Sequence, residues 1–257
     1  MIPIYIVGKT LDDTYFQLLS SIDKHGRRYK ITSGSYEGSE RIEFDRVSGV
    51  IEYPTTKPLS PIMPEGVPAT TTDEKIEDYF INYIMNSYLD KNEHYKYATW
   101  ITGGKYTSPQ WPHPVLKIPN QVKWCINHYK KKGFGNNHCY IQVGNPESCL
   151  AYDIPYENEG ERQTSPCLRG IDTKIINYHG VDKLCFDVYF RSWDLFSGFP
   201  ENMGGFTMLM EYMANELEIS TGYLSFTSSK LHLYDFQLEP VKIRLGQAVK
   251  NKSKKGE

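Results

Sequence analysis

One hairpin-like segment places the strongest constraint on the fold. It contains two β-rich runs, residues 167–176 and 183–191, joined through residues 177–180, whose sequence Asn-Tyr-His-Gly is typical of a hairpin turn. Helical patterns precede and follow this pair of runs. One mixed β-sheet with helices packed against it therefore fits the chain better than a β-sandwich or a helical bundle. The predicted fold class is α/β of the α+β kind.

Hydrophobic periodicity predicts the remaining elements. Amphipathic helices are predicted at residues 11–23, 71–88, 120–132 and 206–217. Strands are predicted at residues 1–7, 41–45, 49–53, 138–143 and 223–227. Thr71 and Glu74 form a capping-box pattern at the start of the second helix. Five prolines in residues 54–68 predict an extended surface segment, and residues 144–166, rich in Asn, Pro, Glu and Gly, predict a long loop.

Length and composition indicate one globular domain. The chain has 257 residues and a formal net charge of −2, and the proportions of 39% hydrophobic and 23% charged residues exclude a disordered protein. We expect one catalytic domain over residues 1–257, with about residues 246–257 as a flexible basic tail. No basic excess indicates a nucleic-acid partner. No apolar stretch approaches the roughly 18 residues that a membrane span needs.

The five cysteines predict free thiols. Their number is odd, their spacing is irregular, and no Cys-x-x-Cys pair indicates a zinc site or a disulfide framework. The start of the chain lacks the positively charged region of a signal peptide. We therefore expect a cytoplasmic protein with reduced thiols and no metal.

Cys167 is the cysteine whose setting favours catalysis. Most free cysteines are buried structural residues, so a cysteine alone is weak evidence. Cys167, however, follows Ser165-Pro166 at the end of the polar loop and begins a strand. Arg169 and Arg191 are expected neighbours that would favour its thiolate form, which is the nucleophilic form.

Four motifs around Cys167 occur in an order that identifies a family. They are Ser165-Pro166-Cys167-Leu168-Arg169, Tyr189-Phe190-Arg191-Ser192-Trp193-Asp194, Gly198-Phe199-Pro200-Glu201-Asn202 and Leu231-His232-Leu233-Tyr234. Across residues 134–240 the chain resembles thymidylate synthases, in particular the shorter type of some archaea and bacteria. Weaker likeness extends upstream to residues 34–38, 77–83 and 95–100. Four ordered motifs are far more specific than any one of them.

The resemblance implies a fold and a reaction. The fold is a single thymidylate synthase-like domain that forms a homodimer through the faces of two sheets. The reaction is the reductive methylation of dUMP to dTMP, with 5,10-methylenetetrahydrofolate as co-substrate and no metal. Cys167 would add as a thiolate to C6 of the pyrimidine and make C5 nucleophilic. Glu77 would organise water for proton transfers at O4, and Tyr97 would assist loss of the C5 proton.

The resemblance also implies the residues that bind the nucleotide and the folate. They are Arg191 and Ser192 for the 5′-phosphate with Arg169 as a further donor, Asn202 for the base, His232 and Tyr234 for the ribose, and Asp194 for the pterin. The carboxamide of Asn202 can both donate and accept, which suits the O4 and N3–H edge of uracil. An aspartate at this position would suit cytosine.

Structural roles are the alternative for several of these residues. His232 fits a core histidine with its hydrogen bonds satisfied, and Asn202 fits a cap for a helix beginning near Gly204. Arg191-Ser192 could end an exposed strand. Glu77 could be a solvated helical residue, with Asp78 in its place in the alignment.

The sequence departs from the larger enzymes of the family in two places that matter for function. In those enzymes the partner subunit contributes an adjacent arginine pair that binds the phosphate. The aligned positions in this chain are Asn137-His138, so Arg27, Arg28 or Arg41 would have to help bind the phosphate. The chain end from Val249 lacks the apolar terminus that closes over the folate. Two alternatives therefore stay open: a nucleotide hydroxymethylase, in which water replaces hydride, and a nucleotide-binding protein without turnover.

Overall fold

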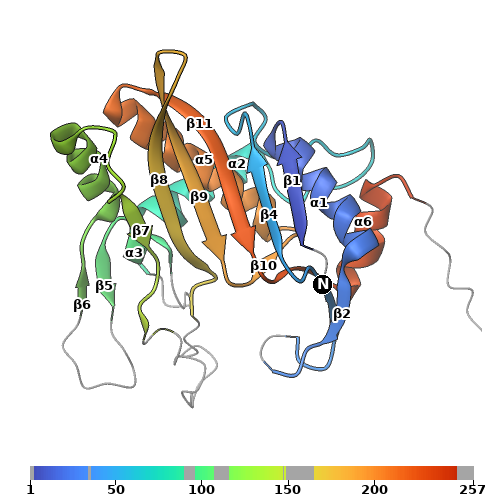
Figure 1. The fold of residues 1–257 in the computed structure, drawn as a ribbon. Coiled ribbons are helices and arrows are strands. Elements are labelled where there is room, and N and C mark those ends of the chain that lie inside the picture. The colour runs from blue at the N-terminus through green and yellow to red at the C-terminus, as the bar shows by residue number, and fades with distance from the viewer. Residues whose placement is uncertain are drawn as a thin grey trace, which may run out of the picture.

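The main β-sheet is built around the predicted hairpin (Figure 1). The computed structural model describes residues 3–33, 36–89, 96–106, 116–146, 148 and 165–247. The six strands of this sheet, in spatial order, are β1 (Ile4–Gly8), β4 (Val47–Ile51), β11 (Ser220–Ser228), β9 (Val181–Phe190), β8 (Leu168–Tyr178) and β7 (Tyr140–Gln142). Parallel and antiparallel pairs both occur, so the predicted mixed sheet is confirmed.

The hairpin turn is tighter than the two predicted runs suggested. From Gly170 and Tyr189 onward, strands β8 and β9 pair without interruption up to Tyr178 and Val181, and only His179 and Gly180 lie between them. These two residues have φ values of 51° and 82°. Both values lie in the left-handed region, as a two-residue loop of type I′ requires. At the other end of the hairpin, Leu168 pairs with Phe190.

A second, four-stranded sheet carries the segments that follow the hairpin. Its order is β10 (Trp193–Asp194), β12 (Leu231–Tyr234), β3 (Glu40–Glu43) and β2 (Arg27–Lys30). A short pair, β5 (Gly104–Tyr106) with β6 (Leu116–Ile118), lies apart from both sheets. Because β10 begins three residues after β9 ends, the two sheets are joined close to the open end of the hairpin.

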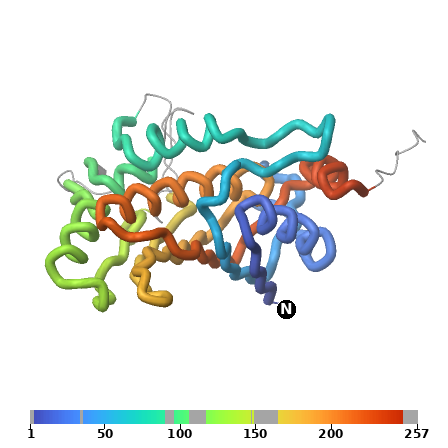
Figure 2. The backbone as a smooth tube through the Cα atoms, turned by 90° about the horizontal axis from the view of Figure 1, so that it is seen from above, coloured from blue at the N-terminus to red at the C-terminus, as the bar shows by residue number. Residues whose placement is uncertain are grey.

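Helices cover one face of the main sheet (Figure 2). The helices that contact its strands are α1 (Leu11–His25), α3 (Ala98–Ile101), α4 (Gln121–Lys132) and α5 (Gly198–Leu217). The other helical segments are α2 (Asp73–Tyr79), the π-helix η1 (Phe80–Met85), the 3₁₀ helix η4 (Asp235–Gln237) and α6 (Leu238–Arg244). Helix α5 lies against the strands, and α2 crosses over α5 on the side away from the sheet. No helix in the described ranges is long and apolar enough to cross a membrane.

Helix α2 differs from its prediction at both ends. Thr72, not Thr71, is its N-cap, since the Thr72 hydroxyl accepts from the backbone N–H of Lys75 at 3.4 Å. After Tyr79 the α-helix gives way to the π-helix η1, which ends at Met85. π-Helical turns are rare and frequently occur at functional sites.

Helix α5 begins eight residues earlier than predicted, at Gly198. Pro200 does not break it, because backbone N–H groups in the first turn have no partner within the helix. The Asp194 carboxylate accepts instead from the N–H groups of residues 196, 197 and 198 at 3.1–3.2 Å. Asn202 therefore lies inside the helix, and the alternative that it caps a helix near Gly204 is wrong.

Two glycines allow α5 and α2 to pack closely. A Cβ atom on Gly204 would lie 2.7 Å from Cγ2 of Ile76, and one on Gly205 would lie 2.7 Å from the ring of Tyr79. Ile76 is fully buried, so it has no free space into which it could move. The small residues set the distance between the two helices.

We expect Gly204→Ala to lower the free energy of unfolding by about 1–3 kcal/mol, the usual cost of overpacking a core. Helix propensity alone predicts the opposite sign, since alanine is favoured over glycine by about 1 kcal/mol in a helix. Urea unfolding measures the difference. Gly135→Ala is the control, because nothing lies within 4 Å of a Cβ atom there. A Gly204→Ala protein as stable as the wild type would show that the helices are not in close contact.

Candidate active site

Cys167 and Arg191 lie opposite each other at the open end of the hairpin. The backbone N–H of Arg191 donates to the Cys167 carbonyl at 3.0 Å, and Nη2 of Arg191 lies 4.0 Å from Sγ of Cys167. The same guanidinium donates to the carbonyls of Ser165 (2.6 Å) and Pro166 (3.1 Å). A guanidinium is therefore held beside the sulfur of a partly exposed cysteine.

The other described cysteines have a different environment. Cys125, Cys139 and Cys185 are fully buried, and burial raises the pKa of each of these thiols. A thiol with a raised pKa stays protonated and is a poor nucleophile. Cys149 lies outside the described residues. Among the described cysteines, exposure and a neighbouring cation therefore distinguish Cys167.

Tyr97 lies next to the proposed nucleophile. Its hydroxyl accepts from the backbone N–H of Leu168, the residue after Cys167, at 3.4 Å. The side chain is only 4% exposed, and its ring packs edge-on against Tyr83 with the ring centroids 5.2 Å apart. The phenol therefore contacts the residue that follows Cys167, and its part in proton transfer stays a prediction.

The segment after Arg191 connects the nucleophile to the second sheet. Ser192 is partly buried, and in β10 Asp194 pairs with His232 of β12. The carboxylate of Asp194 also accepts from the Ser197 hydroxyl at 2.6 Å, in addition to its three bonds at the start of α5. Asp194 therefore has a structural role as a helix cap, and its contact with a pterin stays a prediction.

His232 is oriented as an acceptor. Its Nδ1 lies 2.9 Å from the Lys230 carbonyl, which can only accept, so the proton is on Nδ1 and Nε2 carries a lone pair. Nε2 is buried and has no hydrogen-bond partner among the described residues. Burial lowers the pKa of His232 and favours this neutral form. An unpaired buried acceptor suits a sugar hydroxyl, which can donate to it.

Tyr234 belongs to an aromatic cluster beside His232. The ring centroids of Tyr234 and His232 are 4.9 Å apart, and Tyr36 and Phe236 also contact the Tyr234 ring, at 4.5 and 5.5 Å. Tyr36 has a φ of 67°, which is uncommon for a residue other than glycine. Sequence reasoning missed Tyr36 and Phe236 as neighbours of the site. The only signal for Tyr36 was its place in the weak motif of residues 34–38.

Asn202 contacts two residues that the sequence did not assign to the site. The indole Nε1 of Trp193 donates to Oδ1 of Asn202 at 2.9 Å, and Nδ2 of Asn202 donates to the Tyr79 hydroxyl at 2.8 Å. Trp193 comes directly after Arg191-Ser192, so this contact connects α5 to the segment that follows β9. Tyr79 comes from α2, the helix that carries Glu77.

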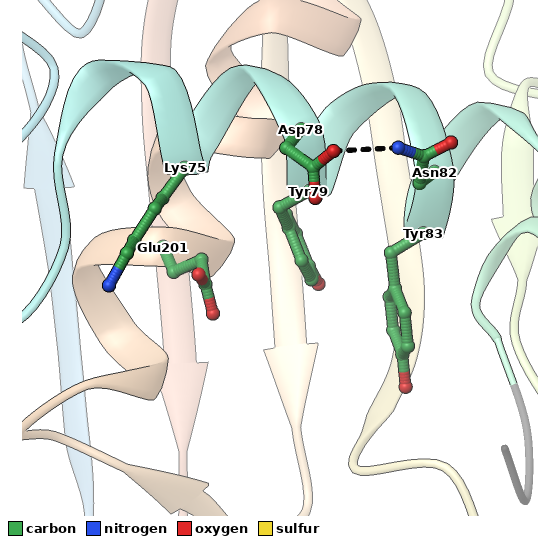
Figure 3. A pocket seen from close by; sticks show the side chains of 6 residues that line it. All are labelled: Lys75, Asp78, Tyr79, Asn82, Tyr83 and Glu201. Carbon is green, nitrogen blue, oxygen red and sulfur yellow. Dashed lines mark hydrogen bonds between the residues drawn. The ribbon is translucent and has the colours of Figure 1, made fainter. Parts of the chain in front are cut away.

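Glu77 points away from this contact. It is exposed, and it precedes Tyr79 by two residues, which is about 200° around an α-helix. The catalytic role of Glu77 stays a prediction with no supporting contact. Asp78, the alternative to Glu77 in the alignment, lines an open cleft together with Tyr79. Its carboxylate accepts a hydrogen bond from the Asn82 amide at 2.7 Å (Figure 3).

The positively charged residues around the site are mostly paired. Arg169 reaches the hydroxyls of Ser148 (3.4 Å) and Ser165 (3.3 Å) from a β-bulge next to Cys167. Arg27, Arg28 and Arg41 form ion pairs with Asp45, Glu40 and Glu43, respectively. Of these three, Arg41 is the register partner of Tyr234, so it is the one beside the predicted ribose residues.

The positions that align with the partner's arginine pair are exposed. His138 and Asn137 lie just before β7, and Nδ1 of His138 is 3.3 Å from Nε2 of His128. Within the described ranges, no group of three or more potential ligands could hold a metal ion.

Comparisons with known proteins agree with the motifs. A family model described as thymidylate synthase matches residues 105–254. A putative thymidylate synthase of Methanosarcina mazei is 24% identical over 238 residues, which cover 92% of this chain and 92% of that protein. A thymidylate synthase of Wigglesworthia glossinidia brevipalpis is 34% identical over 63% of this chain and 54% of its own length. A thymidylate synthase of Mycoplasma genitalium is 34% identical over 26% of this chain and 24% of its own length. The family likeness predicted from the four motifs is confirmed.

We expect His232 to make the chain less stable as the pH falls below about 6.5. The pKa of His232 is lowered in the folded chain, so between that pKa and the unfolded value of 6.5 the unfolded state binds more protons. Stability therefore rises with pH through this window and is lost as the pH falls. Urea unfolding between about pH 5 and 8 should show a weaker pH dependence for His232→Gln than for the wild type. Identical pH profiles would contradict this account.

Proposed function

Because this chain belongs to the thymidylate synthase family, we propose that it transfers a one-carbon unit to C5 of dUMP and forms dTMP. The observation that carries the proposal is the position of Cys167: it is partly exposed, and its sulfur lies 4.0 Å from the Arg191 guanidinium. Two residues after Arg191, the indole of Trp193 donates to the carboxamide of Asn202. The proposed nucleophile and its neighbouring cation thus adjoin the segment that contacts the proposed base-reading amide.

The nucleotide would be held by groups around this segment. Arg191 and Ser192 bind the 5′-phosphate, and Arg169 and Arg41 are the nearby cations that can replace the missing arginine pair. The Nε2 of His232 accepts from a ribose hydroxyl, and Tyr234 packs beside it. These groups come from both sheets, so the substrate would lie across the junction of β9 and β10.

The chemistry follows from covalent attachment. The sulfur of Cys167 bonds to C6, and the electrons of the C5–C6 double bond move to C5 and, through the ring, to O4. Asn202 donates to O4 and so stabilises the charge that develops there. C5 would then bond to the one-carbon unit, and loss of the C5 proton, assisted by Tyr97, would break the bond between that carbon and the folate nitrogen. Hydride from the same folate would reduce the carbon to a methyl group as the thiolate of Cys167 leaves, which restores the C5–C6 double bond and yields dTMP and dihydrofolate. Bound 5,10-methylenetetrahydrofolate supplies the one-carbon unit and the hydride.

The open cleft of Figure 3 is the proposed place for the folate. It has a volume of about 430 Å³ and adjoins the contact of Tyr79 with Asn202. The rings of Tyr79 and Tyr83 are stacked with centroids 5.1 Å apart and form an aromatic wall that suits a planar ring. Burial raises the pKa of Glu201, which lines the same cleft, and Lys75 partly opposes this shift. A half-buried carboxyl group of this kind suits the hydrogen-bond donors of a pterin or amide.

The uncovered face of the main sheet supports the proposed homodimer. Tyr5, Ser48, Thr227 and Tyr189 follow one another as register partners across four strands, so they share one face. Tyr5 and Tyr189 are 66% and 41% exposed there, and no described helix covers them. Light scattering at micromolar concentration should give twice the monomer mass. A monomer under these conditions would contradict association through this face.

Cys167→Ser should abolish turnover and leave nucleotide binding largely intact, because a hydroxyl is a far poorer nucleophile than a thiolate near neutral pH. The expected loss is several orders of magnitude in the rate of tritium release from 5-tritiated dUMP with folate present. Cys139→Ala, which changes a buried thiol, is the control and should keep most of the activity. Substantial activity in Cys167→Ser would eliminate the covalent mechanism.

Mass spectrometry of the nucleotide product separates this proposal from its alternatives. After incubation of the wild type with dUMP and 5,10-methylenetetrahydrofolate, the gain of a methyl group supports the synthase. The gain of a hydroxymethyl group would indicate the hydroxymethylase, and an unchanged nucleotide would indicate a binding protein.

A further inference from the structure

We propose that Trp193 determines the base specificity of this site, because its indole N–H fixes which way the Asn202 carboxamide points, and that Tyr79 holds the amide in that orientation. The inference rests on the proposed function, in which Asn202 reads the base of the nucleotide. Both side chains would act as positioning residues through Asn202.

The chemistry of the indole decides the orientation of the amide. An indole nitrogen can only donate, so the atom of Asn202 that lies 2.9 Å from Nε1 of Trp193 must be the oxygen. The amide nitrogen then faces the Tyr79 hydroxyl at 2.8 Å, which can accept. A flipped amide would place N–H groups against the N–H of Trp193, and this buried mismatch is unfavourable.

Trp193 is held rigidly enough to impose this orientation. It is 3% exposed, and its ring stacks on Phe190 with the centroids 4.0 Å apart and an interplanar angle of 3°. Phe199 and Phe226 pack against it at 4.8 and 6.0 Å. Its backbone N–H donates to the Lys230 carbonyl at 3.0 Å. The indole N–H could change direction only if this aromatic cluster were repacked.

Tyr79 is restrained from the opposite side. Its ring stacks on Tyr83 and lies so close to α5 that a Cβ atom on Gly205 would be 2.7 Å from it. The close approach of α2 to α5 therefore brings the phenol within hydrogen-bond distance of Asn202. A phenol can donate or accept, so Tyr79 reinforces the orientation that Trp193 sets and does not set it alone. A flip of the amide would have to break the Tyr79 hydrogen bond as well, which adds to its cost.

The two contacts leave a hydrogen-bonding pattern that matches one base. A carboxamide has two acceptor sites on oxygen and two N–H donors, and Trp193 and Tyr79 occupy one of each. One acceptor and one donor remain. They match the N3–H donor and O4 acceptor of uracil. The flipped amide would match the N3 acceptor and N4 donor of cytosine, so the orientation of Asn202 decides between the two bases.

The test compares the affinities of dUMP and dCMP by isothermal titration calorimetry, which does not depend on turnover. Trp193→Phe keeps an aromatic ring and removes the donor. We expect the ratio of the dCMP Kd to the dUMP Kd to fall by about ten- to a hundred-fold, as one buried hydrogen-bond mismatch predicts. An unchanged ratio in a folded Trp193→Phe protein would overturn the proposal.

Tyr79→Phe provides a second measurement at a less buried position, in case Trp193→Phe does not fold. It loosens the amide but keeps the Trp193 contact, so the ratio should fall in the same direction by about three- to ten-fold. Tyr178→Phe is the control, because it removes an exposed hydroxyl at the turn end of β8, and it should leave the ratio unchanged. An unchanged ratio in Tyr79→Phe would show that Tyr79 does not hold the amide.

Asn202→Asp separates the failure of this inference from the failure of the proposed function. An ionised aspartate offers only acceptors, so it should shift preference toward dCMP whatever Trp193 does. If Asn202→Asp moves the ratio and neither Trp193→Phe nor Tyr79→Phe does, the positioning role is wrong and base reading by Asn202 stands. If Asn202→Asp leaves the ratio unchanged, Asn202 does not read the base and both proposals fail.

Discussion

The pairing of β8 with β9 is the interaction on which the rest of the site depends. Hydrogen bonds along the hairpin place Cys167 opposite Arg191, although 24 residues separate them in the chain. Arg191 also marks the point where the chain leaves the main sheet for β10. The proposed nucleophile, a neighbouring guanidinium and the start of the second sheet therefore occur together because one ladder of backbone bonds is in register.

The hairpin and most of the main sheet could be predicted from the sequence, because their residues carry local signals. Val188 and Phe190 alternate with exposed residues, and the turn contains a glycine. Strand β2 could not be predicted, since all four of its residues are exposed and show no alternation. The helix predicted from residue 206 begins at Gly198 because the Asp194 carboxylate accepts from backbone N–H groups at its start, a contact that hydrophobic periodicity does not report.

The residues of the candidate site also divide into those that the sequence predicts and those that it does not. Cys167 and Arg191 belong to contiguous motifs, so reading the chain in order was enough to find them. Tyr79 and Trp193 were missed because each contact crosses from one element to another, and no spacing in the sequence reports a contact of Tyr79 with a residue 123 positions away. Glu77 lies on the same helix as Tyr79 but is exposed and faces away from Asn202, so its role stays a prediction.

The two-residue turn at His179 and Gly180 has a consequence for how this chain can change during evolution. Cys167 and Arg191 are each about eleven residues from the turn. The backbone pairing of β8 with β9 therefore fixes where they lie relative to each other. Since side chains alternate faces with a period of two, a one-residue insertion in β8 or β9 would turn every residue beyond it to the other face. Arg169 already occupies one bulge in this ladder. Changes in chain length should therefore accumulate outside the hairpin, in the loops that leave this register untouched.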